Sequence, residues 1–226
     1  MKNSFINKLL TASYKNRFYL LFIALILNFI LPTLLRFPVL DAGLRIFSTA
    51  ILVLSGVNFL EKSKIKLREA WLILGLFIIM SLVISEQHHE SIIYYHIHNG
   101  LKCLFFIILT SSVIKQISST HEVTKDVILG SFCGYILIGI ISYLMFVSLG
   151  LYIPNAFSGL SSNLLERKAQ LFYFTFTTLT TLGFGDILPT HMLTQRLAVL
   201  TAIIGQFYIA IVVAILISRY IQYNRK

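Results

Sequence analysis

A glycine-containing stretch, TTLTTLGFGDILP at residues 177–189, carries the residue types with the clearest chemical potential in this chain. It lies between two long apolar runs and is too polar to cross a membrane as a helix. Gly183 and Gly185 stand at alternate positions and permit backbone conformations that residues with a Cβ avoid, so successive carbonyls can point the same way. Carbonyls of irregular backbone at membrane depth need partners, because an unpaired one in lipid is costly. A desolvated cation is such a partner, and we infer cation coordination as the chemistry of this stretch.

The overall composition indicates an integral membrane protein. Hydrophobic residues make up 57% of the 226 residues and charged residues 12%, with a mean hydropathy of +0.81. At about 20 residues per span, the length allows six transmembrane helices with short connections in an all-α fold. The net charge of +10 comes from lysines and arginines in those connections, as the positive-inside tendency requires. We therefore expect a lipid bilayer and no nucleic acid as partner.

Six apolar runs fit this layout, at residues 18–35, 46–60, 70–84, 101–114, 127–149 and 193–217. Basic residues concentrate before the first run, between the second and third, and after the last. This distribution predicts that both termini are cytoplasmic, with the plasma membrane, or inner membrane of the cell, as the location.

A further short helix is expected between the last two runs. Asn163, followed three residues later by Glu166, resembles a capping box and predicts a helix over about residues 164–179. This segment is too short and too interrupted by threonines to cross the membrane. The chain is therefore expected to enter from the outer face as a re-entrant helix and to return through the glycine-containing stretch.

The motif TLGFGD at residues 181–186 resembles the TVGYGD selectivity filter of potassium channels, in which carbonyls replace the hydration shell of the ion. The resemblance implies that the transported K⁺ is bound by four carbonyls, those of Thr181, Leu182, Gly183 and Phe184. It also implies a supporting role for four further residues, namely Gly185 and Asp186 at the outer mouth and Thr180 and Thr177 behind the filter. It requires no cofactor.

The resemblance also implies an assembly and a division of the chain. One filter loop per chain, where a ring needs four, predicts a homotetramer. The pore domain would be residues 127–226, with an outer helix at 127–149, the pore helix, the filter and an inner helix at 193–218. Residues 1–126 would form four helices resembling a voltage-sensor scaffold. Gly205 is a candidate gating hinge from its place in the inner helix, and close helix packing is the alternative.

Four residues depart from the family pattern. Phe184 lacks the hydroxyl of the usual tyrosine, and Thr177 stands where a glutamate is often found. Tyr173 and Phe174 stand where many relatives carry tryptophans, so we expect the filter to lose a hydrogen bond and to be held by packing. The fourth apolar run has Lys102 near its start and Lys115 directly after its end but no arginine ladder, which argues against steep voltage dependence.

Histidines suggest a sensing role for protons or Zn²⁺, because imidazole titrates near neutral pH and binds metals. The candidates are His88, His89, His96, His98 and, beyond the filter, His191. A two-residue spacing of His96 and His98 favours a strand or loop over one helix face. A solvated rim, or exposure at a helix start for His191, is the alternative.

These features predict a channel that conducts K⁺ passively, and no enzyme, since HExxH, GxSxG and nucleotide-binding motifs are missing from the sequence. One alternative is a weakly selective cation channel. Another is a membrane subunit of a K⁺ uptake transporter, although such filters are repeated four times in a chain. We expect no regulatory domain here, so that such control would require a separate subunit.

Overall fold

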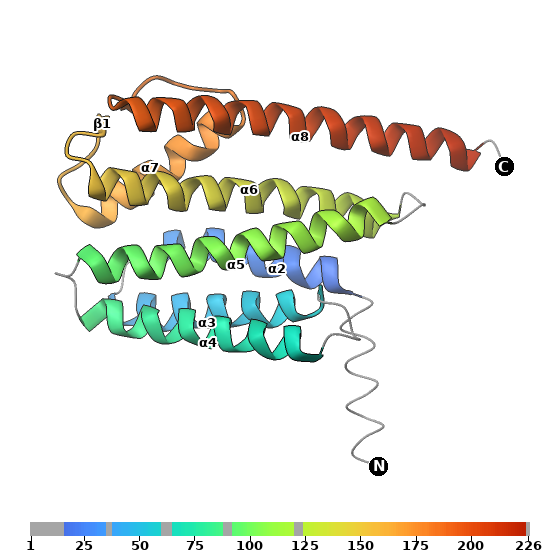
Figure 1. The fold of residues 1–226 in the computed structure, drawn as a ribbon, viewed down its shortest axis with the longest axis horizontal. Helices are drawn as coiled ribbons and strands as arrows, with labels where there is room; N and C mark the ends of the chain where they lie inside the picture. The colour runs from blue at the N-terminus through green and yellow to red at the C-terminus, as the bar shows by residue number, and fades with distance from the viewer. Residues whose placement is uncertain (1–15, 35–37, 60–64, 88–91, 120–123, 225–226) are drawn as a thin grey trace, which may run out of the picture. The chain divides into compact units, whose positions relative to one another are not determined.

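The computed structural model describes residues 16–34, 38–59, 65–87, 92–119 and 124–224, and nearly all of them are helical (Figure 1). The helices are α2 (Arg17–Leu34), α3 (Pro38–Val57), α4 (Ile65–Gln87), α5 (Ile92–Ser119), α6 (Lys125–Tyr152), α7 (Leu164–Leu179) and α8 (Met192–Asn224). Two short strands, β1 (Phe157–Ser158) and β2 (Leu188–Pro189), pair antiparallel. The chain divides into two compact units at Gly134, within α6.

Several helices have the length and composition of membrane spans. Within the described residues, three stretches qualify, His96–Ser119, Lys125–Tyr152 and Met192–Ile215. Shorter apolar stretches lie in α2, α3 and α4, at Arg17–Ile30, Phe47–Val57 and Glu69–Met80. Together they are consistent with an all-α membrane protein.

In the first unit, consecutive helices from α2 to α5 pack against one another. Small residues permit the close approach of α3 and α4, since the Trp71 ring lies against Gly56 and the Val53 side chain against Gly75. The Trp71 indole also donates a hydrogen bond to the Val53 carbonyl at 3.1 Å. The buried tryptophan thus has its single donor satisfied, which stabilises the α3–α4 contact.

A polar contact joins three segments of the same unit. The Gln116 amide of α5 donates to the Phe59 carbonyl at 2.7 Å, and its oxygen accepts a bond from Arg17 Nε at 2.6 Å. The Phe18 and Phe59 rings meet edge to face with centroids 5.1 Å apart. These contacts connect the start of α2 and the end of α5 to the segment that follows α3.

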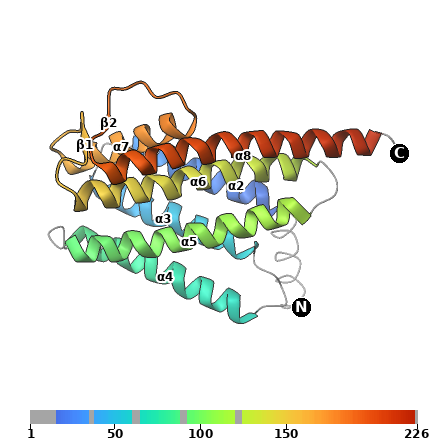
Figure 2. The same cartoon turned by 45° about the horizontal axis from the view of Figure 1, so that its top comes forward.

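In the second unit, α7 packs against α8, and the chain returns from the end of α7 to the start of α8 through β2 (Figure 2). Three buried phenylalanines, Phe146, Phe157 and Phe174, meet edge to face with centroids 5.1 to 5.9 Å apart. They join α6, β1 and α7 in one aromatic cluster, which positions the pieces around the loop after α7.

The start of α7 has half of the expected capping box. The Asn163 side chain accepts bonds from the backbone N–H groups of Leu165 and Glu166, at 2.9 and 3.4 Å. The Glu166 carboxylate does not reach back to the Asn163 N–H, as the box would require. It accepts a bond from the Ser161 hydroxyl at 2.6 Å instead, which ties the preceding loop to the helix.

Candidate functional site

The glycine loop, residues 180–187, follows α7 and has an alternating backbone. Thr181, Gly183 and Gly185 have positive φ values of 60°, 51° and 79°. Glycine adopts this region at little cost, whereas a threonine there is uncommon. An ideal Cβ at Gly183 or Gly185 would meet no atom within 4 Å, so the backbone conformation, not space, requires glycine at these two positions.

Backbone donors of the loop are bonded to the end of α7. The N–H groups of Leu182 and Gly183 both donate to the Thr177 carbonyl, at 2.8 and 3.1 Å, and that of Thr181 donates to the Thr178 carbonyl at 3.0 Å. The last carbonyls of a helix have no partner within the helix, so the loop supplies the donors that they lack. The backbone N–H groups of the loop therefore hold it against the end of α7.

The carbonyls of the same loop are left available. Within the described part of the chain, no hydrogen bond ends on the carbonyl oxygen of any residue from 181 to 184. These residues are also exposed in the single chain. A run of carbonyls without internal donors, on backbone that alternates in sign of φ, is suited to coordinate a cation.

Thr177 and Thr180, which the sequence predicts as supporting residues, lie at the end of α7 beside the glycine loop. The Thr177 hydroxyl donates to the Phe174 carbonyl of its own helix at 3.0 Å, while its carbonyl receives the loop donors. The Thr180 hydroxyl donates to the Phe176 carbonyl at 2.7 Å. Both hydroxyls therefore satisfy α7 itself, and Thr177 supports the loop through its backbone rather than through a glutamate-like side chain.

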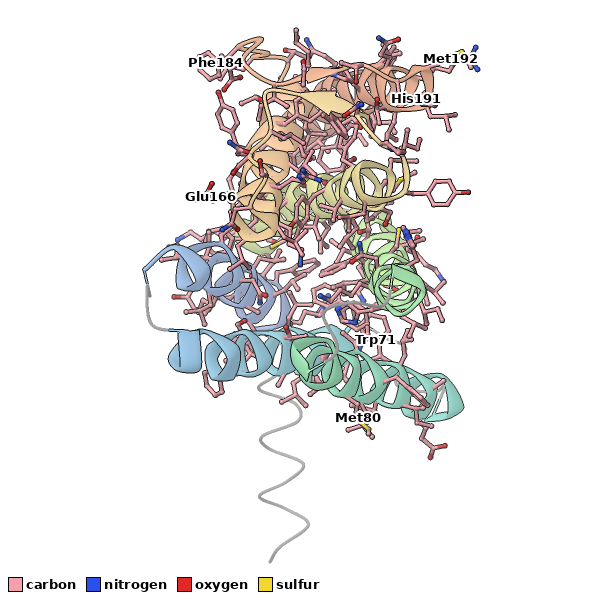
Figure 3. The ribbon with its side chains drawn as sticks, turned by 90° about the vertical axis from the view of Figure 1, so that its left-hand side faces the viewer. Trp71, Met80, Glu166, Phe184, His191 and Met192 are labelled. Atoms are coloured by element: carbon pink, nitrogen blue, oxygen red, sulfur yellow. The ribbon has the colours of Figure 1, made fainter. Side chains whose placement is uncertain are left out.

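Tyr173 of α7 contacts the glycine loop in two ways. Its ring is stacked on that of Phe184, with centroids 6.1 Å apart and an angle of 6° between the planes. Its side chain is hydrogen-bonded to the Asp186 side chain, the hydroxyl being the donor to the carboxylate. A tyrosine here provides a donor as well as a ring, so that a hydrogen bond accompanies the packing contact. Figure 3 shows Phe184 projecting from the loop.

Gly205 lies in α8 where it touches the end of α7. An added Cβ would collide with the Leu179 carbonyl oxygen, so the glycine permits direct contact between α8 and the backbone of α7. The same carbonyl accepts a bond from the Tyr135 hydroxyl of α6 at 3.2 Å. The packing alternative thus has a specific physical basis, and the sequence-derived hinge remains a prediction.

Two residues missed by the sequence reasoning also contact this site, Tyr135 and Gly159. Gly159 has a φ of 81°, and a Cβ there would collide with the Asp186 carbonyl oxygen. The Ser158-Gly159 pair before α7 suggests a turn at most. Because Gly159 and Asp186 are distant in sequence, no local pattern could have shown their contact.

The candidate histidines lie in different surroundings. His96 and His98 are within α5, so the preference for a strand or loop is wrong, and His98 is buried with 4% of its surface exposed. Among the described residues, no group of three or more His, Cys, Asp or Glu side chains is placed to hold a metal. His88 and His89 lie outside the described residues.

His191 has a structural role at the start of α8, where it is labelled in Figure 3. Its Nδ1 atom accepts a bond from the Leu193 N–H at 3.2 Å, and its carbonyl accepts one from the Gln195 N–H at 3.0 Å. The side chain therefore caps the helix, in the manner of an N-cap residue.

Comparison with protein families gives a match that covers this site. A family model described as ion channel matches residues 158–222, from β1 through α7 and the glycine loop into α8. Comparison with curated proteins found no match, and comparison with solved structures found none either. The family match and the apolar helices together support an ion channel of the pore-loop type, and an integral membrane protein.

Proposed function

We propose that the chain is the subunit of a potassium channel, in which residues 181–186 are the selectivity filter. The observation that carries the proposal is the run of available carbonyls from Thr181 to Phe184, on backbone with positive φ at Thr181, Gly183 and Gly185. In such a filter these oxygens replace the water around a dehydrated K⁺ ion. Conduction is passive and needs no cofactor.

The surroundings of the loop favour a cation over an anion. Asp186 is the only Asp, Glu, Lys or Arg between residues 169 and 195, so the formal charge at the loop is negative. The C-terminal end of α7 adds partial negative charge, because the dipoles of a helix sum toward that end. Both contributions attract cations to the backbone carbonyls.

A closed ring of carbonyls needs four copies of this loop, and the chain carries one TLGFGD motif. We infer a homotetramer in the plasma membrane, or inner membrane of the cell, with six spans per subunit, cytoplasmic termini and α8 nearest the axis. Each subunit would consist of a four-helix region at residues 1–126 and a pore domain at residues 127–226. Regulation by a further subunit is compatible with this arrangement.

Flux measurements on reconstituted protein test the proposal. In liposomes with opposed K⁺ and Na⁺ gradients, we expect a membrane potential close to the K⁺ equilibrium value. Equal permeability to the two ions would instead support a weakly selective cation channel. Absence of passive flux, with uptake that depends on another energy source, would favour a subunit of a K⁺ uptake transporter.

The Gly183→Ala variant tests the filter itself. Left-handed backbone costs a residue with a Cβ about 1–2 kcal/mol, and this strain recurs in every subunit, so we expect K⁺ flux to fall at least about tenfold. Gly100→Ala is the matched control, since an added Cβ at either glycine meets no atom within 4 Å but Gly100 lies in the helix α5. Thr181→Ala should also reduce flux by removing the hydroxyl below the carbonyls. Unchanged K⁺ flux in both filter variants would refute the proposal.

A further inference from the structure

The segment before the pore helix folds back onto the residues that follow the filter. Phe157 pairs with Pro189 and Ser158 with Leu188 in a two-stranded ladder of two residues each. A ladder this short is not stable by itself. Other contacts must therefore hold the two segments together.

Two threonines after the filter supply those contacts. The Thr190 N–H donates to the Ala156 carbonyl at 3.0 Å, and the Thr190 hydroxyl donates to the Asn155 carbonyl. The buried Thr194 hydroxyl shares its proton between the same Ala156 carbonyl, at 3.0 Å, and the His191 carbonyl, at 2.8 Å. Asn155 has a φ of 54°, a conformation that asparagine tolerates better than most residues, and it turns the chain toward these donors.

The folded-back segment is also fixed on its other side. Phe157 is buried and packs edge to face on Phe146 of α6 and Phe174 of α7. We call residues 155–159, with Thr190 and Thr194, the outer clamp. Because the aromatic contacts attach the clamp to two helices, it provides a firm surface next to the filter exit.

Gly159 is the point where the outer clamp meets the filter. Two observations exclude a side chain at this position. Its φ of 81° disfavours any residue with a Cβ, and a Cβ added here would collide with the Asp186 carbonyl oxygen. The obstacle is backbone, which cannot rotate away as the end of a side chain can. The Asp186 carboxylate is hydrogen-bonded to Tyr173. The side chain of Asp186 therefore contacts α7, while its backbone carbonyl contacts Gly159.

We propose that the outer clamp is a selectivity-determining element and that Gly159 is its positioning residue, because it sets the direction of the Asp186 peptide. This inference rests on the proposed channel function. Asp186 directly follows Gly185, whose φ of 79° is easily changed because glycine has no Cβ. A displaced Asp186 peptide therefore rotates the preceding peptides and moves the Phe184 carbonyl, the outermost of the expected K⁺ ligands. Loss of that position impairs the discrimination between K⁺ and Na⁺.

The decisive comparison is between Gly159→Ala and Gly150→Ala in liposome-reconstituted full-length protein. An added Cβ at Gly150 makes only ordinary contacts, the shortest at 3.4 Å to Leu171 and Phe157, so this control keeps the clamp. We expect the K⁺/Na⁺ permeability ratio, calculated from the reversal potential, to be several-fold lower in Gly159→Ala than in the wild type. Gly150→Ala should keep the wild-type ratio. An unchanged ratio in a conducting Gly159→Ala protein overturns the inference.

A second pair of variants decides the matter if Gly159→Ala does not assemble. Thr190→Ser keeps the hydroxyl that donates to Asn155, and Thr190→Val replaces it by a methyl group of similar size. We expect a reduced permeability ratio in Thr190→Val and its recovery in Thr190→Ser. Equal ratios in the two variants overturn the inference.

Hydrogen exchange separates failure of the inference from failure of the proposed function. The Thr190 N–H is bonded within the clamp and should exchange slowly in the wild type and faster in Gly159→Ala. A wild type without cation flux refutes the channel proposal, and with it the role in selectivity, even if this amide is protected. Flux with unprotected Thr190 in the wild type refutes the clamp alone.

Discussion

At the scale of residues, Asp186 joins the parts of the candidate site. Its carboxylate is hydrogen-bonded to Tyr173 of α7, and its carbonyl lies against Gly159 of the preceding loop. The next residue, Ile187, is 5% exposed and begins the return to α8. The end of the glycine loop is therefore held by contacts to two segments that precede it, α7 and the loop before α7, which explains how a loop with two glycines keeps a defined shape.

The hydroxyl of Tyr173 allows a direct test of this support. Partial burial of the side chain, then the hydrogen bond to Asp186 and the negative charge of Asp186, raise the pKa of Tyr173 above its ordinary value of 10.0. A raised pKa means that the neutral, donating form is favoured by the fold. Its contribution is complete below pH 10.0 and is lost as the pH rises through the higher value.

We therefore expect the Tyr173-dependent part of K⁺ flux to be constant from neutral pH to about pH 10 and to fall only above it. The Tyr173→Phe variant keeps the ring that stacks on Phe184 but has no donor, so its flux should be lower than wild type at neutral pH and lack this alkaline fall. Tyr19→Phe, at an exposed position in α2, is the control. An identical alkaline fall in Tyr173→Phe would assign it to another group. Flux through liposomes over a pH series measures all three proteins.

At the scale of elements, the contact of α7 with α8 gives Gly205 a testable role. If Gly205 is needed for packing against the Leu179 carbonyl, even a methyl side chain should lower the stability of the protein. If Gly205 is a hinge, it is needed only because the backbone bends there. We expect Gly205→Ala to destabilise the protein by about 1–3 kcal/mol, the usual cost of overfilling a packed contact.

The matched control is Gly43→Ala in α3, where an added Cβ meets no atom within 4 Å and the exchange should be neutral or slightly stabilising. Thermal unfolding in detergent, followed by the loss of helical circular dichroism, measures the difference between the two variants. A Gly205→Ala protein as stable as wild type, but with altered open probability, would favour the hinge.

Local patterns predicted the elements better than the contacts between them. The structure has a helix, α7, over Leu164–Leu179, where the Asn163 cap signal indicated one, and positive φ at both alternating glycines. The contacts of Asp186 depend on how distant segments meet, and no local pattern contains that information. The reading of His96 and His98 was wrong because a spacing of two does not exclude a helix with the two rings on different sides.

At the scale of the whole molecule, the surface of α8 indicates what must surround the second unit. Its buried positions include small or polar residues, Thr194, Thr201 and Gly205, while large apolar side chains such as Phe207 and Ile211 are exposed. In the single chain, residues 180–186 of the glycine loop are exposed as well. Lipid can cover apolar side chains, but it provides no partner for loop carbonyls, which are satisfied only by ions, water or other protein. The proposed tetramer would meet both requirements.

Mixed assemblies test the number of subunits. If one Gly183→Ala subunit disables a ring of four loops, then an equal mixture of wild-type and variant chains should retain about one-sixteenth of the wild-type K⁺ flux. A pore made of two chains would retain about one quarter, and a pore within each chain about one half. The two chains are coexpressed with different tags, purified together and reconstituted at equal total protein, and chain ratios are verified by mass spectrometry. A residual flux near one half would exclude the shared pore, because each loop would then act within its own chain.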